Sequence, residues 1–485
     1  MPVSLEYFQQ RVLKRHASKF QIWTLSVSVV ISGVFFGWNY GLQYGFWNML
    51  IAVMATTFLY FGLTLCIIEL ACLSRQTGGA YVFARMAMGP WGGYLAGLAE
   101  NMEYALAGAT VAVGLGAMAR EVYPDVSEPL CWAVLFLLFG GFGLLGVELS
   151  FGVLLAFLAV ALTTLAVFFG SAISHLDFEQ WALNKSGDDA AIGVYGVLAA
   201  MPYAMWFYLG LESVPLATEE VVDPGKDIPP GGILGVLTVA SLVFATLFIN
   251  ASVDPGSEGL AAAAAPLTTA LEPIWGKGLC LTIFTLLGST GLLTTLQGIL
   301  YAFQRQMYSL ARAGYFPRGL SKTARNKAPY VAIIASGVVG WLLSFTIHTL
   351  GEESRAAAIL VNMTLFGALI SYMMQLVSYI VIRFRSPDAD RSFKSPMGVW
   401  GAGAVLILVV ITFCSLFLDP KNRFAMLGVA IWYAVGVAYF FFHSRHHLLE
   451  EDLSAYIAVA KTPVDGKDET NGNIVNPESD AAPLL

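Results

Sequence analysis

The sequence contains twelve apolar stretches of about 18 residues or more, the length at which a helix crosses a hydrocarbon core of about 30 Å. These stretches occupy residues 22–46, 48–70, 91–118, 129–147, 150–173, 193–213, 231–251, 278–304, 329–349, 357–382, 398–418 and 424–442. Of the 485 residues only 12% are charged and 57% are hydrophobic, and the mean hydropathy is +0.68. The sequence therefore predicts an all-α polytopic membrane protein with twelve transmembrane helices.

The positive charges alternate from loop to loop and predict the orientation in the membrane. With twelve spans, 20 of the 26 Lys and Arg residues lie on the side of the N-terminus and six on the other side. Positive loops face the cytoplasm, so we expect both termini to be cytoplasmic. The plasma membrane is the expected location, and an endosomal or vacuolar membrane is the alternative in a eukaryotic cell.

The two ends of the chain are polar. Residues 1–21 form an amphipathic, basic segment that lacks the apolar core of a signal peptide. Residues 446–485 have the composition of a disordered cytoplasmic tail, and the chain ends in DAAPLL, which resembles an acidic di-leucine sorting signal.

Several function classes find no support in the sequence. The five cysteines form no CxxC pair, and the six histidines show no metal-ligand spacing within a span. No phosphate-binding glycine loop, no GxSxG turn and no basic stripe is present. We therefore expect no enzyme, no catalytic residue, no metal or other cofactor, and no nucleic-acid partner.

Glycine and proline interrupt two of the twelve spans. Ser32, Gly33 and Gly37 interrupt the first span close to the membrane midplane, and Pro202 and Gly210 interrupt the sixth. Broken helices at matching positions of two five-helix halves indicate an inverted-repeat transporter with a central site. The alternative is that these glycines only allow close helix packing.

The third span carries two carboxylates, Glu100 and Glu103, at the depth of the first break. On a helical wheel Glu100 and Tyr104 share one stripe with Gly97 and Gly108, and Glu103 lies ~60° beyond its edge. A charge at this depth costs roughly 2.5–3.5 kcal/mol, and no Lys or Arg is predicted nearby. The carboxylates must therefore hold a proton or meet the ammonium group of a substrate, unless one is neutral and bonds a neighbouring helix. Glu100 is the preferred substrate contact.

Three separated segments resemble the amino acid–polyamine–organocation (APC) permeases. They are TGGAYVFARMAMGPWGGYLAG at 77–97, GLESVPLATEEVVDPGKDIPPG at 210–231, and RQMYSLARAGYFP at 305–317. ISGVFFGWNYGL and GPWGGYLAGLAENMEY are similar, more narrowly, to the ethanolamine permease branch. The resemblance implies a transporter domain over residues 22–445. Its parts would be two inverted five-helix repeats, at 22–173 and 193–382, and two extra helices at 398–442.

The resemblance also implies a substrate site between spans 1, 3, 6 and 8. In such permeases the unwound first span contacts the substrate, an aromatic residue at the position of Trp206 gates the site, and the carboxylate at that of Glu212 senses protons. Together with the third-span pair and the aromatic faces suited to a cation, the expected substrate contacts are Ser32, Gly33, Val34, Phe35, Glu100, Glu103, Tyr104, Trp206, Tyr208 and Gly210.

Ion coupling is expected at a second set of residues. Glu212 and Glu103 are the proton candidates, and Ser289 and Thr290 of the eighth span are the sodium candidates, in a segment that also contains Thr294 and Thr295. Hydroxyl groups in membrane helices commonly bond their own backbone instead. The fifth span lacks the lysine that couples protons in some relatives, so lysine-driven coupling is not expected.

These observations predict a secondary active transporter of a small organic cation such as ethanolamine, working by alternating access as a symporter or exchanger. The alternatives are an amino acid permease, in which first-span amides bind a carboxylate, and a membrane sensor that binds without transport. The expected partners are an amine or amino acid substrate, H⁺ or Na⁺, and the lipid bilayer.

Overall fold

The structure is a computed structural model that describes residues 7, 11–123, 125–183, 192–350, 355–419 and 422–448. The di-leucine-like terminus lies outside the described residues, as does nearly all of the predicted tail. Within the described chain the protein is all-helical, and an isolated bridge between Ala17 and Val221 is the one β-type pairing.

Ten described helices are long and apolar enough to span a membrane. They are α4 (Phe46–Ser74), α5 (Ala80–Val122), α6 (Glu128–Leu145), α7 (Val147–Ala172), α9 (Pro224–Ala251), α12 (Leu279–Arg312), α13 (Tyr330–Leu350), α14 (Arg355–Arg385), α15 (Gly398–Ser415) and α16 (Asn422–Phe442). Two further apolar segments are shorter, Lys19–Phe35 and Val194–Met205. These are the first and sixth predicted spans, so the predicted fold class is confirmed.

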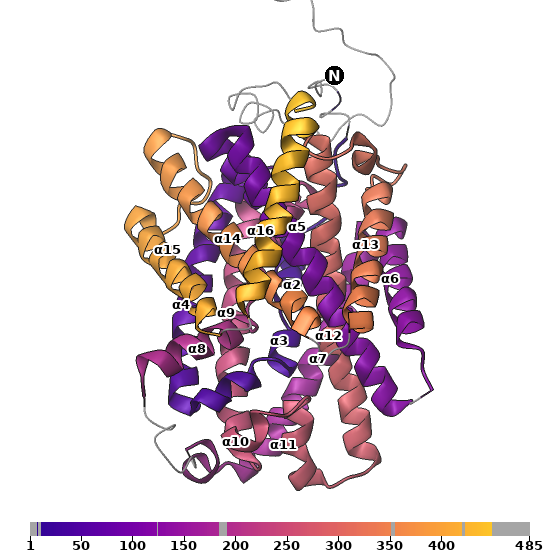
Figure 1. Cartoon of the computed structure of the whole chain (residues 1–485), viewed down its shortest axis with the longest axis vertical. Coiled ribbons are helices and arrows are strands. Elements are labelled where there is room, and N and C mark those ends of the chain that lie inside the picture. The colour runs from indigo at the N-terminus through magenta and orange to yellow at the C-terminus, as the bar shows by residue number, and fades with distance from the viewer. Residues whose placement is uncertain are drawn as a thin grey trace, which may run out of the picture.

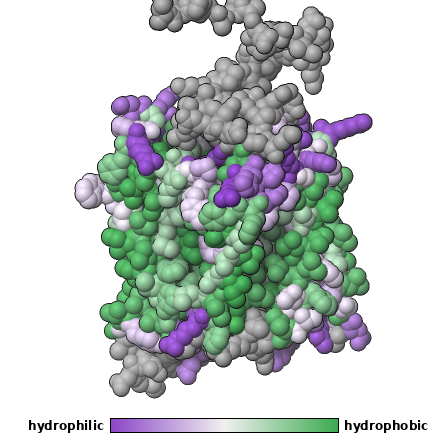
Figure 2. Space-filling view, turned by 45° about the horizontal axis from the view of Figure 1, so that its top comes forward, coloured by the Kyte–Doolittle hydropathy of each residue, from purple (hydrophilic) through white to green (hydrophobic). Residues whose placement is uncertain are grey.

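The helices stand side by side as a bundle, with α6 and α13 on one flank and α14 and α15 on the other (Figure 1). The short helices α10 (Gly256–Leu260) and α11 (Pro266–Trp275) lie at the end opposite the N-terminus (Figure 1). A broad hydrophobic band surrounds the middle of the visible surface, and hydrophilic residues gather at both ends (Figure 2). This is the surface of an integral, multi-pass membrane protein.

Two helix boundaries differ from the sequence-based ones. The fourth and fifth spans separate at Gly146, whose φ of 133° suits glycine, and not at the polar residues 147–150. The third span begins at Ala80 instead of Trp91, because the chain is helical on both sides of a kink at Gly89. Pro90 explains this kink, since a residue before proline is disfavoured in the α conformation.

The first and sixth spans are both interrupted, as predicted. The first consists of α2 (Lys19–Ser28), a turn, the single-turn α3 (Ser32–Phe35) and, after an extended residue, the 3-10 helix η1 (Asn39–Tyr44). In the sixth, α8 (Val194–Met205) is followed by a turn from Trp206, and the 3-10 helix η5 (Leu211–Glu220) begins after Gly210. The backbone changes course twice inside the bundle, where protein and not lipid surrounds it.

Candidate functional site

The two broken spans cross in backbone contact. The α-carbon of Gly33 lies so close to the Trp206 carbonyl that a methyl group there would overlap it. Gly210 has a φ of 107°, and a β-carbon on it would lie 3.4 Å from the carbonyl oxygen of Val29. These two glycines therefore let the breaks approach each other, and here the close-packing and broken-helix explanations of the glycines both apply.

Thr295 of α12 bridges the break in the first span. The amide of Ser32 donates a hydrogen bond of 3.0 Å to Thr295 Oγ1, and the Thr295 hydroxyl donates one of 3.0 Å to the Ser28 carbonyl. The amides of Gly33 and Val34 donate to carbonyls of the preceding turn. The amides that would receive a substrate carboxylate thus have partners within the chain.

Glu100 is fully buried and also has partners within the chain. Its carboxylate accepts hydrogen bonds from the Ala80 amide at 3.2 Å and from Gln306 Nε2 at 2.7 Å. Ala80 is the first residue of α5, so this carboxylate lies at a helix N-terminus, which favours negative charge. Both donors are neutral, and the bond from Gln306 links α5 to α12.

Glu103 is the carboxylate of the third span without such partners. Its side chain is 1% exposed, and neither oxygen accepts a hydrogen bond from the residues that the structure describes. It interacts closely with Glu212 of η5, which is also 1% exposed. Glu212 Oε2 accepts from the Tyr372 hydroxyl at 2.7 Å and from the Gly210 amide at 3.2 Å, whereas its Oε1 is free of hydrogen bonds. Within the described chain, three of the four oxygens of this pair have no well-formed hydrogen bond.

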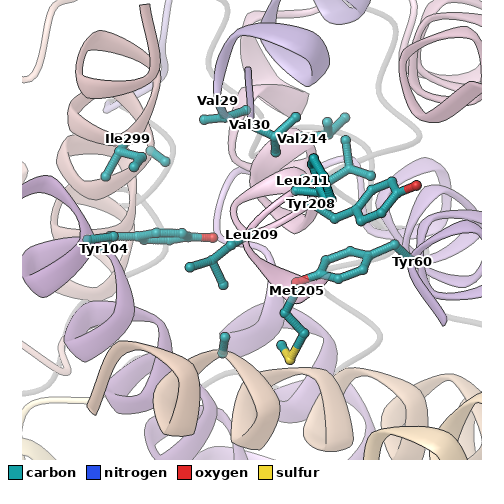
Figure 3. Close-up of a cluster of buried hydrophobic side chains, with 14 of the residues drawn as sticks. Val29, Val30, Tyr60, Tyr104, Met205, Tyr208, Leu209, Leu211, Val214 and Ile299 are labelled. Carbon is teal, nitrogen blue, oxygen red and sulfur yellow. The ribbon is translucent and has the colours of Figure 1, made fainter. Parts of the chain in front are cut away.

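Tyrosine side chains surround the carboxylate pair. The buried Tyr104 hydroxyl points toward the sixth-span break near Leu209 and makes no hydrogen bond (Figure 3). Tyr60 stacks on Tyr208, with ring centroids 5.2 Å apart, and its hydroxyl lies 3.2 Å from that of Tyr372. Aromatic faces and hydroxyl groups beside buried carboxylates form an environment suited to an organic cation.

Comparison with known proteins agrees with this architecture. The family model for amino acid permeases matches residues 23–452. This chain belongs to the amino acid permease family. It is similar to the branched-chain amino acid permease BcaP of Bacillus subtilis, with 24% identity over 468 residues that cover 90% of this chain and 95% of the relative.

Other relatives of this permease have different substrates. The methylthioribose transporter of Bacillus subtilis is 27% identical over 76% of this chain and 75% of its own. The putrescine transporter PotE of Haemophilus influenzae is 22% identical over 74% of this chain and 81% of its own. All are transporters and none is an enzyme, and the family handles amino acids or amines.

Ion pairs close the N-terminal side of the permease. Arg305 Nη2 lies 2.8 Å from Glu220 Oε1, and Arg312 pairs with Glu219. The Arg312 guanidinium also donates a hydrogen bond of 2.7 Å to the Arg11 carbonyl, so the N-terminal segment is part of the closure. These contacts join the end of η5 to the end of α12 and separate the central carboxylates from this side.

A cavity of about 180 Å³ lies on the other side of the first-span break. Phe35 and Phe36 line it together with Met118 of α5, Leu267 of α11 and Thr285 of α12. Phe35 also packs on Gly288 and Gly291 of α12. Phe35 is thus positioned between the cavity and the region of the break.

The remaining predicted residues fall into two groups. Trp206 lies against Gly37, with side-chain atoms 3.8 Å from where a β-carbon would stand, beside the two breaks. The Tyr208 hydroxyl instead shares a hydrogen bond of 2.7 Å with the Thr57 hydroxyl, and the Tyr208 ring stacks on Tyr60. The hydroxyls of Ser289 and Thr290 bond carbonyls of their own helix, one turn back. Both hydroxyls of the sodium candidates therefore have partners within α12 itself.

Sequence reasoning missed Tyr60, Tyr372 and Gln306, which contact or surround the carboxylates. Each lies in an otherwise apolar span, and one polar residue among many gives no signal of its partner. Thr295 was noticed only as one of four hydroxyl residues in its segment. Thr295 differs from the other three because it bonds the backbone of α2 and α3, and only the folded chain brings that backbone to it.

Proposed function

We propose that this permease is a secondary active transporter of small organic cations, with ethanolamine or a related primary amine as substrate, working by alternating access. The observation that carries the proposal is the buried Glu103 carboxylate, which accepts no hydrogen bond and lies beside Glu212. Among the described residues, no Lys, Arg or His forms an ion pair with either carboxylate. A charge in this position needs a partner, and a substrate ammonium supplies one.

The proposal places the substrate ammonium at Glu103 and Glu212, and Glu100 serves as a positioning residue. This reverses the order that the sequence favoured, because Glu100 already accepts two hydrogen bonds. Tyr104 and Trp206 contribute aromatic faces, and Phe35 separates the site from the cavity on the opposite side. In a plasma-membrane protein whose N-terminus is cytoplasmic, the closed side faces the cytoplasm and this cavity faces the outside.

An amino acid permease is the second candidate, and the names of relatives such as BcaP favour it. In that case a substrate carboxylate would have to displace Thr295 from the Ser32 amide or bind elsewhere at the break. Substrates without a carboxylate need no such displacement. This difference supports an amine over an amino acid.

Proteoliposome uptake across a substrate panel tests the proposal. Radiolabelled ethanolamine, putrescine, leucine and D-serine are compared, with pH and sodium gradients varied independently. We expect saturable ethanolamine uptake that other small primary amines inhibit. Transport of leucine without ethanolamine would contradict the proposal and favour the second candidate, and binding without any flux would indicate a sensor.

The variant Glu103→Gln connects this activity to the site. We expect amine uptake to fall at least about 100-fold, because one good charge-assisted contact contributes roughly 1.5–3 kcal/mol and a second effect comes from burial of the ammonium. The matched control is Glu272→Gln. Glu272 is a half-exposed residue of α11 whose carboxylate pairs with Lys277. Equal uptake by the two variants would remove Glu103 from the site.

A further inference from the structure

We propose that the groove between α6 and α13 binds an anionic phospholipid, with an acyl chain in the groove and the phosphate at the basic turn of residues 322–327. The two helices lie side by side on one flank of the bundle (Figure 1). The proposal concerns the lipid-facing surface of the permease and does not depend on which substrate the permease carries.

The groove is a hollow of about 450 Å³ whose lining residues all belong to these two helices. Phe136, Gly140 and Gly141 of α6 face Gly337, Val338 and Trp341 of α13 across it. A β-carbon on Gly141 would meet no described atom within 4 Å, and one on Gly337 would meet only the Phe136 carbonyl oxygen at 4.0 Å. The hollow therefore exists because these glycines carry no side chain.

The walls of the groove are apolar and open to the membrane. Leu137 is 76% exposed and Val338 is 53% exposed. Trp341 Nε1 donates a hydrogen bond of 3.1 Å to the Pro129 carbonyl, so the indole N–H is already satisfied within the chain. Lipid tails are as apolar as these side chains, so the groove alone does not select one lipid over another.

The turn at residues 322–327 contains three cations and no acid. Lys322, Arg325 and Lys327 are exposed. Within the described chain none of the three forms an ion pair. Three unpaired cations at one end of a helix pair attract an anionic lipid headgroup.

Hydrogen bonds fix this turn at one end of the groove. Asn326 Nδ2 donates a hydrogen bond of 2.8 Å to the carbonyl of Leu144, which lines the groove near the end of α6. Asn326 Oδ1 accepts one of 3.2 Å from the Ala328 amide. The Tyr7 hydroxyl lies 2.8 Å from Ser321 Oγ, so this end of the groove is on the side of the N-terminus.

Charge complementarity favours a phospholipid over another transmembrane helix as the occupant. A phospholipid carries an apolar chain and an anionic phosphate in one molecule, and the groove and the turn present their complements side by side. Glu148, in the first turn of α7, does not cancel the charge of the turn, because it pairs with Lys14 at 2.7 Å. Basic pockets between membrane helices bind anionic headgroups in this way.

Quenching of tryptophan fluorescence by brominated lipids tests the proposal on the full-length permease, because Trp341 lies in the groove. The permease is reconstituted in phosphatidylcholine bilayers, and phosphatidylglycerol or phosphatidylcholine with brominated acyl chains is titrated in. The signal of Trp341 is the difference between the wild type and Trp341→Phe. We expect phosphatidylglycerol to quench this signal at a mole fraction at least about tenfold lower than phosphatidylcholine does, since each nearby cation contributes about fivefold.

A charge variant tests the basic turn. Arg325→Gln with Lys327→Gln should reduce the preference for phosphatidylglycerol about tenfold or more. The matched control, Lys19→Gln with Lys394→Gln, removes two other exposed cations and should keep the preference of the wild type. Equal loss of preference in the two double variants would assign it to the overall charge of the permease and overturn the proposal.

A second variant tests the groove. Gly337→Leu places a side chain in the hollow without a clash and should reduce quenching of Trp341 by either lipid. Its control is Gly152→Leu on the exposed surface of α7, where an added β-carbon also meets no described atom, and quenching should persist. Unchanged quenching in Gly337→Leu would show that no acyl chain lies in the groove.

The wild type alone can also overturn the proposal. Equal quenching by both lipids would mean that only bulk lipid covers Trp341. An absence of quenching by either lipid would mean that a second copy of the chain or another helix covers the groove instead.

Discussion

Buried glutamates in two regions of the permease have different partners. At the N-terminal side, Glu220 pairs with Arg305, and Glu69 of α4 pairs with Arg383 and Arg391 at 2.7 and 2.9 Å. In the middle of the bundle, Glu100, Glu103 and Glu212 have only neutral donors, or none, among the described residues. We call the first set the ion-paired layer and the second the central layer.

The difference follows from where a basic side chain can be placed. Arg383 lies in the last turn of α14, and Arg305 lies about two turns before the end of α12. A guanidinium costs least toward such helix ends in a membrane protein. An arginine in the central layer would neutralise the carboxylates permanently and occupy the position of a cationic substrate. The ion-paired layer lies at the N-terminal side, and the central layer is where the proposed function places the cationic substrate.

The largest expected effect, on the stability of the permease, comes from removing a basic partner from the ion-paired layer, so that its glutamate lacks a cation as those of the central layer do. Arg305→Ala leaves the 2%-exposed Glu220 with the Tyr301 hydroxyl but without a cation. Breaking a buried pair in this way costs about 3–5 kcal/mol. We expect a clear fall in the apparent Tm of the permease in detergent.

Two variants control for this result. Lys277→Ala breaks an exposed pair with Glu272 and should cost no more than about 1 kcal/mol. The double variant Arg305→Ala with Glu220→Ala should recover part of the Tm lost in the single variant. An unchanged Tm in Arg305→Ala would mean that the two layers do not differ in the way described.

A smaller effect is expected at the first-span break, which depends on neutral hydrogen bonds from Thr295. Thr295→Val keeps the side-chain shape but removes the bonds to the Ser32 amide and the Ser28 carbonyl. Buried groups left without partners cost about 1–3 kcal/mol, so both Tm and ethanolamine uptake should fall. Thr295→Ser retains the hydroxyl and should restore both, and failure of that rescue would assign the effect to packing.

The smallest effect tests whether a sodium ion supplies the central layer with a cation. The hydroxyls of Ser289 and Thr290 bond Leu286 and Leu287 of the same helix. We therefore expect the Ser289→Ala, Thr290→Ala double variant to keep uptake within about twofold of the wild type at any sodium concentration, because such back-bonds contribute little. Uptake that depends on sodium in the wild type and is lost in this variant would contradict this expectation. Sodium would then be the cation of the central layer, and the two layers would no longer differ in having a cation.

Much of the fold could be predicted because it follows from local sequence. All twelve spans were predicted from length and hydropathy, and glycine with proline predicted the breaks in the first and sixth, which are the two short ones in the structure. The site was predicted less completely. Glu103, Glu212 and Gly210 were identified separately, but nothing in the sequence indicated that Glu103 of α5 and Glu212 of η5 meet.

By itself, then, the sequence determined that the chain crosses a membrane many times, breaks two helices inside it and carries acids at the depth of the breaks. Hydropathy, glycine and charge are properties of single residues or short segments, so they can be read without the fold. Only the tertiary structure decided that Glu100 is satisfied by Ala80 and Gln306 while Glu103 is not. That distinction depends on contacts across as many as 206 positions, which no local pattern encodes.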